Sequence, residues 1–252
     1  MKISLVAASV LVLLFGGLPS MGQDQHAVGN FEKSVYEVPR LSKPFLIDAD
    51  WNKSEWKKTP TLVIDKYMGK IPDFKPGVEA KMMYDDENVY VIFRVKDKYV
   101  RSVVQDYNGN VSADACVEFF FAPDIALPDE YFNLEVNAGG TPLIFYVTKP
   151  WTGFNKLNIE DIRQIEIAHS LPARIDPEIS EPVTWTLEYR VPLSLLRKFS
   201  KVSTPAPGVR WKANFYKTAS STSNPHWITW SHVDKPQPDF HLPQFFGTLI
   251  FK

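Results

Sequence analysis

The sequence has very few of the residues that build disulfide frameworks or metal clusters. Its 252 residues include a single cysteine, Cys116, so no disulfide can form within the chain. A disulfide-stabilised scaffold is therefore excluded, and the chain is long enough to be held together by an apolar core. Three histidines, His226, His232 and His241, lack the spacing of a zinc site. We assign no metal ligand from the sequence.

The chain also lacks an excess of charge of either sign. Lys and Arg number 28 against 29 Asp and Glu, which gives a formal net charge of −1. This balance gives no electrostatic reason to expect nucleic acid or an anionic membrane as a partner. Basic runs, low-complexity tracts and internal repeats are absent from the sequence as well. We therefore expect a single domain without a polyanion-binding surface.

Long apolar runs are limited to one, Ile3–Phe15, which is too short to predict a membrane span. It follows a basic Lys2 and precedes the small residues Ser20 and Gly22. This pattern predicts a cleavable signal peptide over residues 1–22 and hence a secreted or periplasmic protein without a stable membrane anchor. A retained N-terminal anchor is the alternative.

Prolines and aromatic residues are abundant, with 20 prolines and 13% aromatics, a composition that suits short strands joined by rigid loops. Val89, Val91, Phe93 and Val95 alternate with other residues in the pattern of a half-buried strand. We predict an all-β fold, an antiparallel β-sandwich, in one domain over 44–252 that follows a loose lead-in over 23–43. The expected strands are 45–47, 78–84, 89–95, 116–121, 131–138, 141–147, 185–191, 209–218, 227–230 and 248–251, with very short helices near 54–56 and 193–199.

The last part of the sequence carries the strongest functional signal. An aromatic segment, Trp227–His232, leads into a polar loop that again holds aromatics beside Asp, Gln and His over Pro238–Gly247. Such a mixture indicates a flat polar ligand such as a sugar. The alternative is that these rings cap the core of the sandwich.

Seven segments, taken in order, carry a resemblance to a known family. They are Ile47-Asp48 with Trp56, then 83–91, 114–120, 132–140, 185–192, 211–216 and 239–247. Together they resemble the carbohydrate-binding module family 9-like proteins over most of the chain. The resemblance implies a β-sandwich of jelly-roll type, a sugar site at one end of the sheets and, in many members, structural calcium. It also implies a place in polysaccharide-degrading systems.

The resemblance carries over to individual residues only in part. Phe240 lies where the family has one of two tryptophans that sandwich the sugar, and Glu118 matches a carboxylate that accepts sugar hydroxyls. Glu135 stands where the family has a basic residue, and Tyr216 replaces an amide. No aromatic lies near the second tryptophan position, so Trp151 or Tyr107 is expected to supply that ring. The candidate ligand-binding residues are Glu118, Glu135, Asn137, Trp151, Asn214, Tyr216, Phe240 and His241.

The chemistry of these residue types agrees with a sugar ligand. A pyranose needs an aromatic plate for its C–H face and fixed acceptors for its hydroxyls, and a carboxylate accepts two such hydrogen bonds. Glu135 and Asn137 lie two apart on one strand and share a face, as do Asn214 and Tyr216. The alternative is a solvated sheet face, with Glu118 simply pointing outward.

We expect a non-catalytic domain that binds a mono- or oligosaccharide, with other polysaccharide-degrading proteins as further partners. A glycoside hydrolase that uses Glu118 and Glu135 as its acid pair remains the main alternative. It requires a raised pKa on one carboxyl, and the small Ala138 and Gly139 after Glu135 predict little burial there, so we expect no hydrolysis.

Three further alternatives stay open. One is a domain without a ligand that serves structure or protein interaction. Another is a haem site that uses Met82 or Met83. The third is calcium held by the acidic run 85–88, which an ordinary hairpin turn explains equally well.

Overall fold

The computed structural model describes residues 32–252, and the expected signal peptide lies outside these residues. Within them the chain forms sixteen strands and three helices of four residues each. The antiparallel β-sandwich with very short helices is confirmed. The helices are α1 (Ser54–Lys57), α2 (Ile159–Ile162) and α3 (Leu193–Leu196), and two 3-10 turns cover Val111–Ala113 and Pro243–Phe245.

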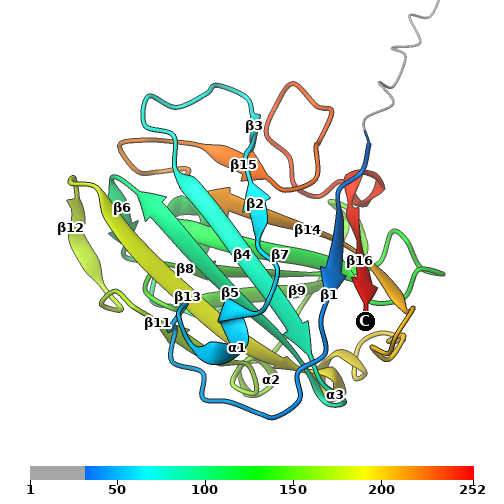
Figure 1. Cartoon of the computed structure of the whole chain (residues 1–252). Coiled ribbons are helices and arrows are strands. Elements are labelled where there is room, and N and C mark those ends of the chain that lie inside the picture. Colours follow the sequence, from blue (N-terminus) through cyan, green and yellow to red (C-terminus); the bar gives the residue numbers. More distant parts are fainter. Residues whose placement is uncertain (1–31) are drawn as a thin grey trace, which may run out of the picture. The chain divides into compact units, whose positions relative to one another are not determined.

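Two sheets pack face to face, with β4, β5 and β13 crossing β7, β8 and β14 (Figure 1). The larger sheet has the order β1-β16-β14-β7-β8-β9-β10, and β15 and β3 extend it beside β14. Its strands are β1 (Val35–Val38), β3 (Lys66–Met68), β7 (Cys116–Ala122), β8 (Tyr131–Asn137), β9 (Pro142–Lys149), β10 (Gly153–Lys156), β14 (Arg210–Thr218), β15 (Trp227–Thr229) and β16 (Gly247–Phe251).

The smaller sheet has the order β11-β13-β5-β4-β2 and is antiparallel throughout. Its strands are β2 (Leu62–Ile64), β4 (Gly77–Tyr84), β5 (Asn88–Asp97), β11 (Glu166–His169) and β13 (Val183–Pro192). A separate pair joins β6 (Val100–Ser102) to β12 (Ile175–Ile179). No helix among residues 32–252 combines the length and the apolar character needed to cross a membrane.

The main core lies between the two sheets and follows the period of two in each strand. Odd-numbered residues of β7 and β14 face inward, and the rings of Phe119 and Phe215 stack with centroids 4.6 Å apart. Even-numbered residues of the same strands, such as Glu118, Phe120 and Tyr216, therefore face outward. This alternation brings the candidate site residues to the outer face of the larger sheet.

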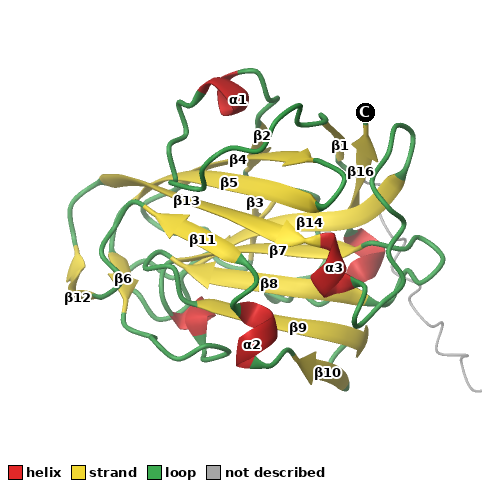
Figure 2. Cartoon of the chain, turned by 90° about the horizontal axis from the view of Figure 1, so that it is seen from below, coloured by secondary structure: helices red, strands yellow, loops and turns green. Residues whose placement is uncertain are grey.

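The outer face of the smaller sheet is covered rather than solvated. Ile47, Trp51 and Trp56 pack against Tyr90 and Ile92 there, which is why β5 is buried on both faces and not half-buried as its alternation predicted. α1 lies beyond β4 and β5 on this side (Figure 2). The predicted helix near 54–56 is confirmed.

A buried carboxylate on β13, Glu188, holds this covering segment in place. It accepts hydrogen bonds from the backbone nitrogens of Asp48 (2.9 Å) and Ala49 (2.7 Å), from Trp56 Nε1 (2.7 Å) and from Lys53 Nζ. These bonds fix the backbone just after residues 45–47. The prediction of a strand at 45–47 is wrong, since these residues pair with no neighbouring strand.

Part of the expected lead-in belongs to the sandwich. Residues 35–38 form β1, which runs parallel to β16 with Val35 opposite Thr248. A strand of four residues whose partner lies more than two hundred positions away leaves little local signal. The strands β2, β3, β6, β10, β11 and β12 were not predicted either, because runs of three to five residues are too short to show a clear period of two.

The strands predicted at 131–138 and 141–147 are confirmed as β8 and β9, which pair in antiparallel register across a turn at Gly139-Gly140. Gly140 has φ +86°, a conformation that favours glycine, and a Cβ there would lie 2.4 Å from the ring of His169. This turn fixes the end of β8, the strand that carries Glu135.

Candidate functional site

A small pocket of about 190 Å³ opens on the outer face of the larger sheet. Its floor comes from adjacent strands, because Glu118 on β7 lies directly opposite Glu135 on β8. Tyr216 on β14 lies opposite Glu118 on its other side. The antiparallel register therefore joins three of the predicted residues in one row. The pocket lies on a sheet face and not at one end of the sheets, where the resemblance placed the sugar.

Glu118 is the unusual group on this floor. It is 2% exposed, lines the pocket, and has no hydrogen-bond or ion-pair partner among residues 32–252. A buried carboxylate without a donor is costly, so such a group is uncommon unless a ligand satisfies it. Burial, and next the charge of Glu135, raise the pKa of Glu118 well above its usual value of 4.5.

Glu135 is 8% exposed and accepts one hydrogen bond, from Asn133 Nδ2 at 3.0 Å. Burial raises its pKa from 4.5 to about 7. The expectation of little burial at this position is wrong. It considered the small residues that follow Glu135 in sequence, whereas Glu118 on β7 and Leu143 on β9 flank it across the sheet.

The loop between β15 and β16 forms one wall of the pocket. Phe240 lines the pocket and stacks on Tyr216 with ring centroids 4.1 Å apart and an interplanar angle of 14°. The Tyr216 hydroxyl also donates to the Phe240 carbonyl at 3.2 Å. Tyr216 thus supports the aromatic wall from behind and does not itself line the pocket.

Asn214 anchors the start of the same loop. Its Oδ1 accepts from the Ser231 nitrogen at 2.8 Å and its Nδ2 donates to the Ser231 carbonyl at 3.0 Å. Asn137 is similarly engaged with the Val104 carbonyl, Asp114 and the Thr141 nitrogen. Both amides are buried outside the pocket, so the structure places them as supports and not as groups that reach its cavity.

The turn between β9 and β10 adds a further aromatic residue to the pocket lining, next to the β15–β16 loop. Trp151 sits there with φ +64° and is 59% exposed, and its ring meets His241 edge-on at 4.9 Å. His241 Nδ1 pairs with the Tyr131 hydroxyl at 2.7 Å. Burial lowers the pKa of His241 from 6.5 to about 4, so its ring is neutral at physiological pH.

The sequence analysis missed several residues that line the pocket. Asp239, 8% exposed, forms an ion pair with Lys235 and accepts from the His241 nitrogen at 3.0 Å. The period of two around Glu118 and Tyr216 could have indicated Phe120 and Thr218. The other missed lining residues are Ser112, Trp227 and Pro238.

One group of side chains in the described residues is close enough to hold a metal ion. Potential ligand atoms of Cys116, Glu118 and Glu135 all lie within 4.8 Å of one another. Sequence spacing alone could not indicate this group, because the three residues come together only through strand pairing. Burial also raises the pKa of the Cys116 thiol, which opposes its use as a thiolate ligand.

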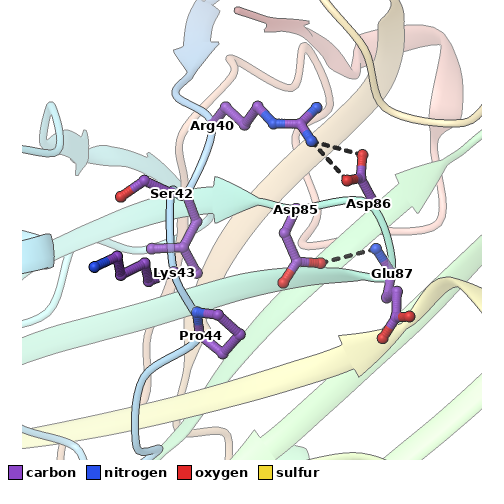
Figure 3. A pocket seen from close by; sticks show the side chains of 8 residues that line it. Arg40, Ser42, Lys43, Pro44, Asp85, Asp86 and Glu87 are labelled. Carbon is purple, nitrogen blue, oxygen red and sulfur yellow. Dashed lines mark hydrogen bonds and ion pairs between the residues drawn. The ribbon is translucent and has the colours of Figure 1, made fainter.

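A larger, open depression of about 560 Å³ lies between residues 40–44 and the turn at 85–87 (Figure 3). Its two aspartates have partners within the protein. Arg40 pairs with Asp86 at 2.7 Å, and Asp85 accepts from the Glu87 and Asn88 nitrogens and from the Tyr90 hydroxyl. These bonds favour the hairpin-turn interpretation of the acidic run. Met82 and Met83 are buried as core residues, at 0% and 3% exposure.

The fold and the pocket together define a β-sandwich that can bind a small polar ligand through aromatic rings and carboxylates. The sequence profile of carbohydrate-binding family 9 matches residues 49–251. The chain belongs to this family, and the resemblance stated from its motifs is confirmed.

Solved structures agree with this assignment. A candidate carbohydrate-binding protein from Bacteroides uniformis ATCC 8492 is 27% identical, with a TM-score of 0.79 over 88% of this chain and 100% of that chain. Family 9 modules from Caldicellulosiruptor kristjanssonii, in complex with cellotriose and with glucose, are 16% identical with a TM-score of 0.60. They cover 87% of this chain and 94% and 96% of theirs. No curated protein matches the chain.

Proposed function

We propose that this chain is a non-catalytic module that binds one sugar ring in the pocket above Glu118. The single observation that carries the proposal is the buried, unpartnered carboxylate of Glu118 beside aromatic walls. A volume of about 190 Å³ is below the roughly 300–1,000 Å³ of pockets for drug-sized ligands, so one ring is the unit that fits.

Phe240, Trp151 and Glu118 each make a different kind of contact with the sugar in this proposal. Phe240 offers a flat apolar surface for the C–H face of a pyranose, and Trp151 at the rim closes over the other side. Glu118 accepts hydrogen bonds from two neighbouring hydroxyls. The ligands printed for the Caldicellulosiruptor modules, glucose and cellotriose, are the first sugars to test.

Calorimetric titration of the purified chain with glucose and cellotriose tests the proposal. We expect saturable binding at one site and about tenfold weaker binding in Glu118→Gln, because an amide nitrogen replaces one of the two oxygens that accept sugar hydroxyls. Glu160→Gln, which changes an exposed carboxylate on α2, serves as the matched control and should bind as the native chain does. Absence of saturable binding to any sugar on a glycan array would favour a domain without a sugar ligand.

One observation favours a second candidate, a glycoside hydrolase. The carboxylates of Glu118 and Glu135 approach within 4.8 Å, near the roughly 5 Å separation of retaining enzymes, and both have raised pKa values. However, the two side chains rise from directly opposite positions on paired strands and share one floor. A hydrolytic pair must instead flank the scissile bond, so we favour binding. Release of reducing sugar that disappears in Glu135→Gln would overturn this preference.

We also propose that the chain is exported to the periplasm or beyond and works beside polysaccharide-degrading proteins. The apolar run Ile3–Phe15 after Lys2 supports export, and the family assignment supports the setting. N-terminal sequencing of the exported protein should begin within a few residues of Gln23. An intact Met1 in a membrane fraction would contradict it.

A further inference from the structure

We propose that the pocket selects a sugar that carries a free ammonium group, that is, an amino sugar, over its neutral counterpart. This inference rests on the proposed function and specifies its ligand class. It follows from the charges that line the pocket and from the absence of a cationic partner for two of them.

The charged side chains that line the pocket are all acidic. Glu118, Glu135 and Asp239 line it, whereas no lysine or arginine does so among the described residues. Lys235 pairs with Asp239 and accounts for that charge. No lysine or arginine in the described part of the chain forms an ion pair with either of the two glutamates on the floor.

Other polar groups do not compensate for these two carboxylates. The one donor to the pair within residues 32–252 is the neutral Asn133 amide, which contacts Glu135 only. The positive charge of Lys217 partly offsets the rise in the pKa of Glu118, but Lys217 lies on the inner face of β14, where it pairs with Asp97 at 3.1 Å and donates to His226. It is 0% exposed and cannot enter the pocket.

An ammonium group fits this environment better than a hydroxyl does. It brings a full positive charge and three donors in a compact head, enough to contact Glu118 and Glu135 together across their separation of at most 4.8 Å. A hydroxyl supplies one donor and no charge. The aromatic rings of Phe240 and Phe120 would attract the same cation while receiving the sugar's apolar face.

The same argument separates a free amine from an acetylated one. An N-acetyl group is neutral, donates one hydrogen bond and is larger, so it gains nothing from two carboxylates in a pocket of about 190 Å³. Selectivity should therefore depend on the substituent alone, with the ring and linkage held constant.

Three β-1,4-linked trimers that differ only at C2 provide the test: cellotriose, the glucosamine trimer and the N-acetylglucosamine trimer. Titrated into the full chain at neutral pH, the glucosamine trimer should bind about tenfold more tightly than cellotriose, the scale of one added charge-assisted contact. In Glu135→Gln the preference for the glucosamine trimer over cellotriose should fall to about twofold or less. Glu160→Gln should leave the preference unchanged and so excludes a general surface-charge effect.

The outcomes separate the two proposals. If cellotriose binds as tightly as the glucosamine trimer, or if the preference survives in Glu135→Gln, the amino-sugar inference is wrong and sugar binding stands. If none of the trimers binds, the proposed function fails with it. If calcium or zinc ions alone bind with the same dependence on Glu135 and displace the glucosamine trimer, the pocket is a metal site and the inference is overturned.

Discussion

Replacing Glu135 with glutamine should stabilise the protein at alkaline pH. The substitution keeps the size of the side chain and the oxygen that accepts from Asn133 Nδ2. It removes a negative charge that is buried at 8% exposure beside Glu118. The native carboxylate is thus expected to cost stability whenever it is ionised and no ligand is bound.

The size and sign of the effect follow from the pKa of Glu135. Because the folded state raises this pKa from 4.5 to about 7, it binds more protons than the unfolded state between these values. The associated stability is fully present below pH 4.5 and is lost as the pH rises through 7. The difference corresponds to about 3 kcal/mol, which Glu135→Gln should recover above neutral pH.

Urea unfolding of the native chain and of Glu135→Gln, at pH values below and above this window, measures the effect. The two proteins should differ little in acid, and the variant should be more stable by about 3 kcal/mol in alkali with an unchanged denaturant slope. Glu160→Gln should follow the native chain at both pH values. A variant that is equally or less stable in alkali would refute the argument that Glu135 is an uncompensated buried acid.

Further substitutions separate binding from folding. Trp151→Ala should weaken sugar binding by about 1–2 kcal/mol without lowering the melting temperature, since the ring is 59% exposed. Ile159, which is 52% exposed, provides the control, and Ile159→Ala should change neither the affinity nor the melting temperature. Phe240→Ala should weaken sugar binding by about 1–3 kcal/mol. It should also lower the free energy of unfolding in urea by about 3 kcal/mol, because the ring is 8% exposed and stacked on Tyr216. Unchanged affinity in the folded fraction would show that Phe240 is a core residue only. Glu188→Ala should destabilise the fold by about 3–5 kcal/mol, because Lys53 and the donors of the 48–56 segment lose their acceptor. Sugar affinity should stay unchanged. A parallel loss of affinity would show that the smaller sheet influences the pocket on the larger one.

Local sequence patterns correctly predicted those parts of the fold that form between neighbouring segments of the chain. The β4–β5 hairpin was predictable because Asp85 and Asn88 provide turn chemistry between two apolar strands. The period of two correctly grouped Glu135 with Asn137 and Asn214 with Tyr216 on the outer face of their sheet. This period could not show that the amides of Asn137 and Asn214 are already hydrogen-bonded to other parts of the protein.

The features that could not be predicted from the sequence depend on pairing between segments that lie far apart in the chain. The row formed by Glu118, Glu135 and Tyr216 exists only in the register of β7, β8 and β14, which no short window of sequence specifies. Burial of Glu135 follows from that register and not from its neighbours in the chain. The strand β1 was not predicted for the same physical reason, because its partner β16 lies more than two hundred residues further along the chain.

A crystal structure of the chain soaked with cellotriose tests the central claim most directly. The account predicts one sugar ring in the pocket on the larger sheet, stacked against Phe240, with hydroxyls at hydrogen-bond distance from the carboxylate of Glu118. A sugar bound at another surface, with the pocket over Glu118 empty at saturating ligand, would contradict it.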